Sequence, residues 1–146
     1  MVLFAQVSAF ILLTIFLFLG SLHVYWAMGG KWAVRAAVPE VKGKAAFTPP
    51  PFLTMVVAVG LFGFGVLAII LGLQETTQPQ AWFTYLAWGA VAIFGLRAIG
   101  DFKYAGFAKL INPKAILHTQ FARNDTRIYS PLCLLIATLF ILIIFS

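Results

Sequence analysis

The chain has 146 residues, of which 62% are hydrophobic and only 10% carry a charge. Soluble domains are typically about half apolar and about one quarter charged, and a chain this apolar could not cover its surface with polar groups in water. The single cysteine, Cys133, excludes an internal disulfide or a Cys-x-x-Cys redox site. We therefore expect an integral membrane protein in which residues 1–146 form one domain.

The net charge of +6, taken alone, is typical of proteins that bind nucleic acid. The basic residues, however, occupy short segments between apolar runs, which is the pattern of positively charged loops beside membrane spans. Each basic residue near an anionic bilayer surface contributes roughly 1 kcal/mol of attraction. The expected partners are therefore membrane lipids and not nucleic acid.

Four apolar runs are long enough to be membrane spans, because about 20 helical residues cross a bilayer core of about 30 Å. They cover residues 2–26, 52–73, 81–99 and 131–146, the last of which is short for a span. The prolines at 49–51 mark the start of the second run. Ser130 is expected to cap the fourth helix, with Pro131 at its first position. The pattern predicts an all-α, four-helix bundle with up-and-down topology.

The connections between these runs differ sharply in charge. All ten lysines and arginines lie in or beside the segments 27–51 and 100–130, whereas residues 74–80 carry only Glu75. In a four-span chain the first and third connections share one side of the bilayer. Since cytoplasmic loops are enriched in Lys and Arg, we expect segments 27–51 and 100–130 in the cytoplasm and both termini outside.

Residues 101–121, between the third and fourth runs, mix large apolar side chains with Lys103, Lys109 and Lys114. This composition is too apolar for a free loop and too often interrupted for a span. It predicts an interfacial segment that lies along the cytoplasmic leaflet.

The centres of the four spans contain no Asp, Glu, Lys, Arg or His. Proton-coupled transporters usually place an ionisable group near the midplane of the bilayer, so this composition argues against an active transporter. The second and third spans also contain glycines, which let helices approach closely in membranes. We expect these glycines to be packing contacts: Gly60, Gly63, Gly65, Gly89 and Gly95.

Ionisable and aromatic residues gather where the first, third and fourth spans reach the basic side. In an up-and-down bundle these three ends would converge at the cytoplasmic mouth. The residues so placed are the candidate ligand-binding residues: His23, Tyr25, Trp26, Arg97, Asp101, Asp125 and Tyr129.

This mouth would suit an amphiphile whose apolar body lies between the helices. Arg97 would bind an anionic or carbonyl head group, with Asp101 or Asp125 as its carboxylate partner. His23, together with Tyr129, would handle protons or hydrogen bonds. The alternative is that charged and aromatic residues at helix ends only anchor the helices at the interface or form a structural ion network.

The sequence gives no sign of a metal site or a cofactor. His23 and His118 lie far apart, and neither has a second ligand three or four residues away. There is no Ser/His/Asp signature, phosphate-binding loop or dinucleotide fingerprint. We expect no metal and no cofactor, and the sequence leaves open whether the protein is an enzyme.

Three motifs follow one another along the chain: HVYWAMGG at 23–30 with Pro39 after it, RAIGDF at 97–102, and FARNDT at 121–126, which runs into YSPL at 129–132. They resemble the motifs of a bacterial membrane family, the domain of unknown function 3995. The resemblance covers most of the chain. It implies a small four-helix protein of the bacterial inner membrane and implies no activity. The motif residues coincide with the candidate mouth.

Three functional hypotheses remain open. The first is a protein that binds, or an enzyme that acts on, a lipid or amphiphile at the cytoplasmic mouth. The second is a non-catalytic accessory or assembly subunit that binds a membrane protein partner. The third is a small exporter that works as a homo-oligomer, specifically as a dimer.

Overall fold

The computed structural model describes residues 2–41, 44–74, 81–100, 105–112 and 119–146. Its long helices are α1 (Val2–Ala27), α3 (Pro51–Gly72), α4 (Ala81–Ile99) and α6 (Ser130–Ile144). The short elements are α2 (Val34–Ala37), α5 (Gln120–Asn124), the 3₁₀ helix η1 (Phe107–Ile111), the π-helical turn η2 (Asp125–Tyr129) and the strands β1 (Glu40–Val41) and β2 (Lys44–Ala45). The two strands pair antiparallel, with Glu40 opposite Ala45. The predicted all-α fold is confirmed, apart from this two-residue ladder.

Four helices are long and apolar enough to cross a membrane, as the sequence predicted. The first three agree with their predicted bounds within about two residues. The fourth differs, because α5, η2 and α6 form one continuous helical segment over Gln120–Ile144. The protein is therefore a multi-pass membrane protein whose fourth helix begins well before the apolar run.

The predicted helix start at Ser130 is wrong for a local reason. Thr119 caps the helix instead, since its side chain accepts a hydrogen bond from the backbone N–H of Ala122 at 3.1 Å. Pro131 then falls inside a helix, where it removes a backbone N–H and crowds the preceding turn. The π-helical turn η2 ends immediately before Ser130, and such wider turns relieve this kind of interruption.

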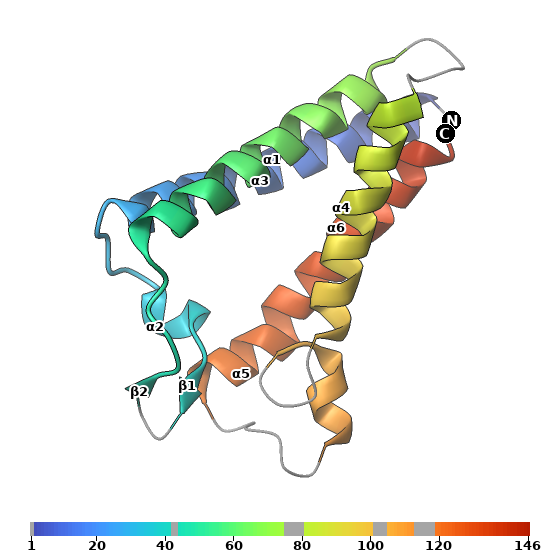
Figure 1. Cartoon of the computed structure of the whole chain (residues 1–146). Coiled ribbons are helices and arrows are strands. Elements are labelled where there is room, and N and C mark those ends of the chain that lie inside the picture. Colours follow the sequence, from blue (N-terminus) through green and yellow to red (C-terminus); the bar gives the residue numbers. More distant parts are fainter. Residues whose placement is uncertain (1, 42–43, 75–80, 101–104, 113–118) are drawn as a thin grey trace.

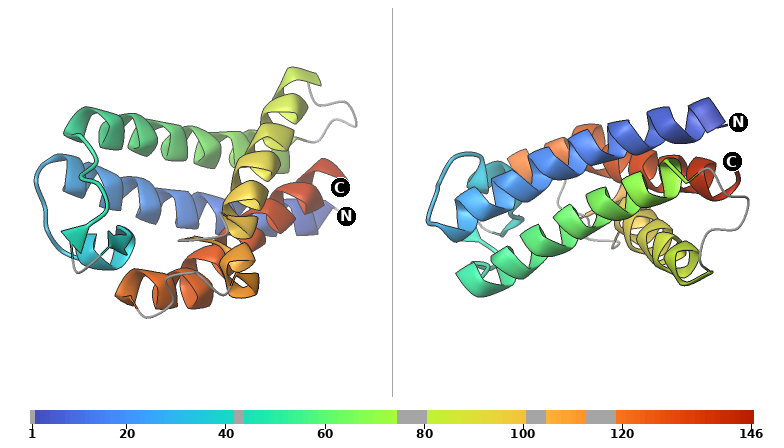
Figure 2. Two further views of the ribbon diagram at one scale, coloured as in Figure 1. Left: turned by 60° about the horizontal axis from the view of Figure 1, so that its bottom comes forward. Right: turned by 90° about the horizontal axis from the view of Figure 1, so that it is seen from above.

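The four helices form two antiparallel pairs, α1 with α3 and α4 with α6 (Figure 1). The pairs meet at the end of the molecule that holds both termini, the end of α3 and the start of α4, which we call the terminal end. They diverge toward the opposite end, which holds the long connections and which we call the connection end (Figures 1 and 2). The predicted up-and-down order is confirmed, but the helices do not run parallel over their whole length.

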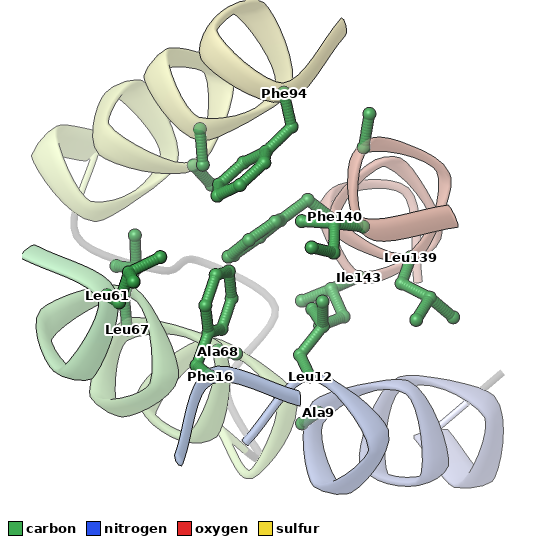
Figure 3. Close-up of a cluster of buried hydrophobic side chains, with 14 residues drawn as sticks. Ala9, Leu12, Phe16, Leu61, Leu67, Ala68, Phe94, Leu139, Phe140 and Ile143 are labelled. Atoms are coloured by element: carbon green, nitrogen blue, oxygen red, sulfur yellow. The ribbon is translucent and has the colours of Figure 1, made fainter. Parts of the chain in front are cut away.

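An apolar core joins the two pairs on the terminal side of the molecule (Figure 3). Each long helix contributes one phenylalanine to its centre. The ring of Phe16 lies 5.8 Å from that of Phe64, 5.5 Å from that of Phe94 and 6.1 Å from that of Phe140, measured between centroids. Tilted aromatic pairs at these distances attract each other beyond the area that they bury. This cluster holds α1, α3, α4 and α6 together.

The glycines in the spans fall into two groups, so their prediction as packing contacts holds only in part. Gly65 and Gly72 face α1, and a Cβ added to Gly72 would lie 2.9 Å from the carbonyl oxygen of Ala5. By contrast, an added Cβ would meet nothing within 4 Å at Gly60, Gly63, Gly89 or Gly95. Close approach of α1 and α3 therefore depends on the first group and on Gly20 of α1, where an added Cβ would lie 2.6 Å from the ring of Phe62.

The connection end is closed by contacts between segments that are distant in sequence. Helix α2 packs against α5, and the hydroxyl of Tyr129 donates a hydrogen bond to the carbonyl oxygen of Ala36 at 3.0 Å. These contacts link the first connection, which belongs to the α1–α3 pair, to the start of the fourth helix. The diverging pairs are thus joined at both ends.

The predicted interfacial segment at 101–121 is described only in part. Over 105–112 it forms a turn and η1, in which Ala108 and Lys109 are buried while Leu110 and Ile111 are exposed. From Gln120 onward it belongs to the fourth helix. Its described part packs against the end of α4 rather than forming a separate amphipathic helix.

Candidate functional site

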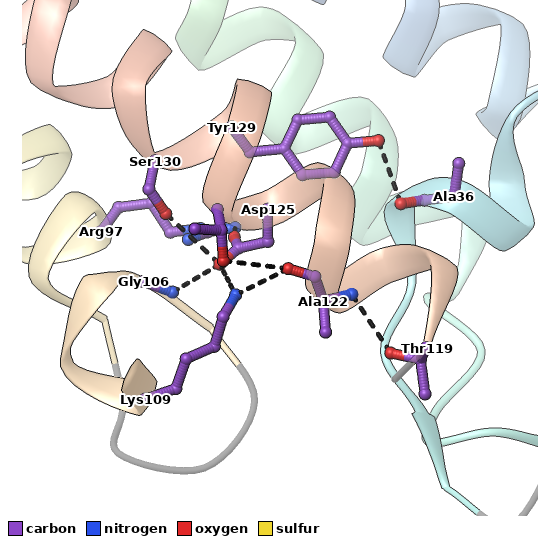
Figure 4. A network of polar contacts seen from close by, with 10 residues as sticks. Ala36, Arg97, Gly106, Lys109, Thr119, Ala122, Asp125, Tyr129 and Ser130 are labelled. Atoms are coloured by element: carbon purple, nitrogen blue, oxygen red, sulfur yellow. Dashed lines mark hydrogen bonds and ion pairs between the residues drawn. The ribbon is translucent and has the colours of Figure 1, made fainter. Parts of the chain in front are cut away.

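A buried carboxylate at the connection end gathers the polar side chains of three segments (Figure 4). Oδ1 of Asp125 accepts a hydrogen bond from Nη2 of Arg97 at 2.7 Å. Its Oδ2 accepts from Nζ of Lys109, from the backbone N–H of Gly106 at 2.7 Å and from the hydroxyl of Ser130 at 3.3 Å. We call this set the Asp125 network. It ties α4 and the segment before η1 to the fourth helix.

The side chains of Asp125 and Lys109 are both fully buried, at 0% exposure. Nζ of Lys109 also donates to the carbonyl oxygen of Ala122 at 3.1 Å. Removing one partner of a buried ion pair leaves an uncompensated charge and costs about 3–5 kcal/mol. Lys109 is therefore an internal structural cation, although the sequence suggested that it belonged to a charged interfacial surface.

Local geometry explains why Asp125 faces inward. It opens the π-helical turn η2, whose closing hydrogen bond runs from the N–H of Ser130 to the carbonyl of Asp125. A turn with i→i+5 bonding brings these two residues to the same face. Ser130 is fully buried there, and its hydroxyl donates to Asp125 instead of capping a helix. Single π-helical turns occur frequently at functional sites.

Two glycines bring the third connection onto this carboxylate. Gly100 and Gly106 have φ of +71° and +76°, a region that favours glycine. Their backbones lie in contact, and a Cβ on either residue would collide with the other. This contact holds the N–H of Gly106 at the end of α4, where it reaches Asp125.

Arg97 differs from Lys109 because it is only partly sequestered. Its side chain is 36% exposed, and a single contact joins it to Asp125. Its Nη1 is buried and has no hydrogen-bond partner among the residues that the structure describes. Arginine commonly binds a carboxylate through two parallel hydrogen bonds. The predicted pair of Arg97 and Asp125 is present, but it uses one oxygen of the carboxylate and leaves donors of the arginine unused.

The aromatic residues predicted for the mouth form a separate group at the end of α1. Nδ1 of His23 donates a hydrogen bond to the carbonyl oxygen of Leu19 at 2.8 Å, since a carbonyl oxygen can only accept. The His23 ring packs edge-on against Trp26 at 5.0 Å between centroids. Nε1 of Trp26 donates to the carbonyl of Trp32 at 2.8 Å, and the hydroxyl of Tyr25 accepts from the N–H of Trp32 at 3.4 Å. We call these four residues the α1-end group: His23, Tyr25, Trp26 and Trp32.

The expected convergence of all the candidate residues at one mouth is not what the structure shows. The end of α1 and the end of α4 lie apart, because the helix pairs diverge (Figure 1). The described contacts join Arg97 to Asp125 and place the α1-end group elsewhere. Tyr129 lies on the side of the fourth helix that faces α2, where it contacts Ala36 (Figure 4). Asp101 lies outside the described residues.

The candidate ligand-binding residues predicted from the sequence did not include Lys109 or Ser130, and Ser130 was expected to cap the fourth helix. A lysine in a segment with other lysines is usually solvated, and only the contact across the third connection reveals its burial. One signal was available, because Asp125 is the sole acidic residue of the third motif and Arg97 the sole basic residue of the second. A buried carboxylate that faces an arginine frequently recruits further donors.

The Asp125 network can orient Arg97 and hold a positive charge near the surface of the connection end. No group of three or more His, Cys, Asp or Glu side chains that could hold a metal ion occurs in the described part of the chain. The partly exposed guanidinium group of Arg97 gives this network a side chain that can bind a polar or anionic partner.

Comparison with known proteins agrees with the motifs. A family model described as "Protein of unknown function (DUF3995)" matches residues 16–140, a range that includes the whole Asp125 network and the α1-end group. No curated protein and no solved structure matches the chain. The chain therefore belongs to the DUF3995 family of proteins of unknown function, and it is a multi-pass membrane protein with four apolar helices.

Proposed function

We propose that this protein binds a lipid or another amphiphile at the connection end, with the polar head of the ligand at Arg97. The observation that carries the proposal is the incomplete pairing of Arg97 in an otherwise satisfied network. Among the described residues, Asp125 accepts hydrogen bonds from four donors, whereas Arg97 makes one contact, to Asp125, and stays 36% exposed. A guanidinium group held in this way has N–H donors left for a ligand.

The apolar surface beside the network supports an amphiphilic ligand. Within α1, all of which is described, no residue after Gly20 is buried. Within α6, also described throughout, no residue between Ser130 and Ile136 is buried. The divergence of the helix pairs therefore leaves apolar faces partly uncovered near the connection end. An acyl chain could cover part of this surface while its head group reaches Arg97.

We further propose that the connection end faces the cytoplasm of a bacterial inner membrane. The exposed basic residues at this end include Lys31, Arg123 and Arg127. Of the other lysines and arginines, Arg97 lies near the end of α4 and the rest belong to the same two connections. Cytoplasmic loops carry this excess of positive charge. A ligand drawn from the cytoplasmic leaflet would then reach Arg97 directly.

The test uses the full chain purified in the neutral detergent dodecyl maltoside. Mass spectrometry identifies the lipids that remain bound, and thermal unfolding measures the stabilisation produced when these lipids are added back. Arg97→Gln is expected to abolish the stabilisation. Arg123→Gln removes the same charge from an exposed arginine and is expected to retain it.

Two results would contradict the proposal. One is stabilisation of equal size in Arg97→Gln and in the unchanged protein. The other is that Arg97→Gln fails to fold and that no lipid stabilises either this variant or the unchanged protein. That result would assign the network a purely structural role.

A further inference from the structure

Arg97 and Lys109 place two positive charges against the single carboxylate of Asp125. Among the described residues, three of the four donors to this carboxylate contact Oδ2, including Nζ of Lys109, and only Arg97 contacts Oδ1. Because Lys109 is fully buried, water does not screen its charge, and it compensates much of the negative charge of Asp125. The described network therefore carries an excess of one positive charge, which lies on the side of Arg97.

From this imbalance we infer that the ligand head at Arg97 is an oxyanion, either a carboxylate or a phosphate ester, and not a neutral carbonyl or hydroxyl group. The inference rests on the proposed function and names the chemical class of its ligand. A neutral head would accept a hydrogen bond but would leave the excess charge uncompensated at a partly desolvated position. An oxyanion supplies both an acceptor and the missing negative charge.

The geometry of Arg97 favours an oxyanion for a second reason. Nη2 is held by Asp125, while Nη1 is buried without a partner among the described residues. Asp125 therefore fixes the plane of the guanidinium group and leaves its other edge unused. Planar donors fixed in this way match the two oxygens of a carboxylate or phosphate group.

Two sources could provide such an oxyanion, namely the head group of a membrane lipid or a soluble anion. We therefore use three probes with the full chain in dodecyl maltoside. Dioctanoyl phosphatidylglycerol carries the oxyanion on two acyl chains, dioctanoylglycerol has the same chains without charge, and glycerol 3-phosphate has the charge without chains. The shift in thermal unfolding midpoint, followed as each probe is titrated, gives a dissociation constant.

We expect dioctanoyl phosphatidylglycerol to bind about tenfold more tightly than dioctanoylglycerol, as one charged hydrogen-bonded contact would produce. Arg97→Gln should reduce this ratio to about one, whereas the matched variant Arg123→Gln should keep it. Strong stabilisation by glycerol 3-phosphate alone would support the oxyanion and identify its source as soluble. That result would contradict the amphiphile of the proposed function.

The inference and the proposed function can fail separately. Equal affinity for the charged and uncharged lipids, with both weakened by Arg97→Gln, would overturn the oxyanion and leave the amphiphile site standing. Stabilisation by none of the three probes would overturn both.

A second variant keeps the inference testable if Arg97→Gln does not fold. Arg97→Lys preserves the charge that pairs with Asp125 and removes the planar fork of donors. We expect it to fold and to lose several-fold of the preference for phosphatidylglycerol, while Arg123→Lys keeps the preference. Full preference in Arg97→Lys would overturn the assigned role of the guanidinium group.

Discussion

The two ends of the molecule are held together by different forces. On the terminal side one phenylalanine from each long helix meets in an apolar core, and the contacts are numerous and non-directional. At the connection end one carboxylate holds three segments through directional, charged contacts. Apolar packing therefore holds the two helix pairs together on the terminal side, whereas the position of the third connection depends on Asp125.

The two ends also differ in the polar groups that they contain. A tightly packed apolar core offers no polar group to a ligand, and its phenylalanines serve the fold. The connection end retains an arginine whose donors are not all used. In membrane proteins, polar residues that touch the spans are costly and are usually retained for function.

The largest expected effect comes from Asp125→Asn. The change leaves Lys109 buried and Arg97 partly buried without their counter-charge, so we expect a loss of about 3–5 kcal/mol in the free energy of unfolding. Thermal or denaturant unfolding in detergent measures the loss. Because replacing all members of a buried ion network is far less costly than removing one, the double variant Asp125→Asn/Lys109→Met should recover part of the stability. A double variant less stable than Asp125→Asn would contradict the assignment of Lys109 as the buried partner.

A smaller effect is expected at two glycines of α3, where alanine should destabilise the protein at one position and not at the other. Gly72→Ala places a Cβ against Ala9 and 2.9 Å from the backbone oxygen of Ala5, and overpacking of this kind costs about 1–3 kcal/mol. Gly60→Ala meets nothing within 4 Å and should leave stability unchanged or raise it by up to about 1 kcal/mol, since alanine favours the helix. The same unfolding measurement compares the two variants. Equal destabilisation would indicate that Gly60 contacts a partner helix.

The smallest effect concerns the contact that joins the helix pairs at the connection end. Tyr129→Phe removes the hydrogen bond to Ala36 and should cost about 1 kcal/mol. It should also raise the rate of amide hydrogen exchange in α2 (Val34–Ala37), because this segment would lose its link to the fourth helix. Tyr85→Phe, at a tyrosine that is 74% exposed, is the matched control. Unchanged exchange in α2 would show that packing of α2 on α5 suffices to hold the two pairs together.

Much of the fold could be predicted because, in a membrane, the sequence of a segment largely decides by itself whether that segment forms a helix. An apolar run of about 20 residues must become a helix in lipid, since every backbone N–H and C=O has to be paired within the segment. The runs at 2–26, 52–73 and 81–99 became α1, α3 and α4 with nearly the same bounds. The run at 131–146 forms the apolar part of the fourth helix. The hydropathy pattern did not reveal that this helix begins earlier, in a polar stretch at Gln120.

The pair of Arg97 and Asp125 could also be anticipated, because a partly desolvated arginine needs a carboxylate and few are available in this chain. The burial of Lys109 could not. It depends on a contact between segments 16 residues apart, on the touching backbones of Gly100 and Gly106 and on the turn that points Asp125 inward.

The sequence by itself thus determined how many helices cross the membrane, their order and the end at which the basic residues gather, because hydropathy and charge act residue by residue. Only the tertiary structure decided that the helix pairs diverge, that the aromatic residues at the end of α1 stay apart from Arg97 and that Lys109 joins Asp125. Those features depend on packing angles and on the competition of several donors for one carboxylate, which no local pattern encodes.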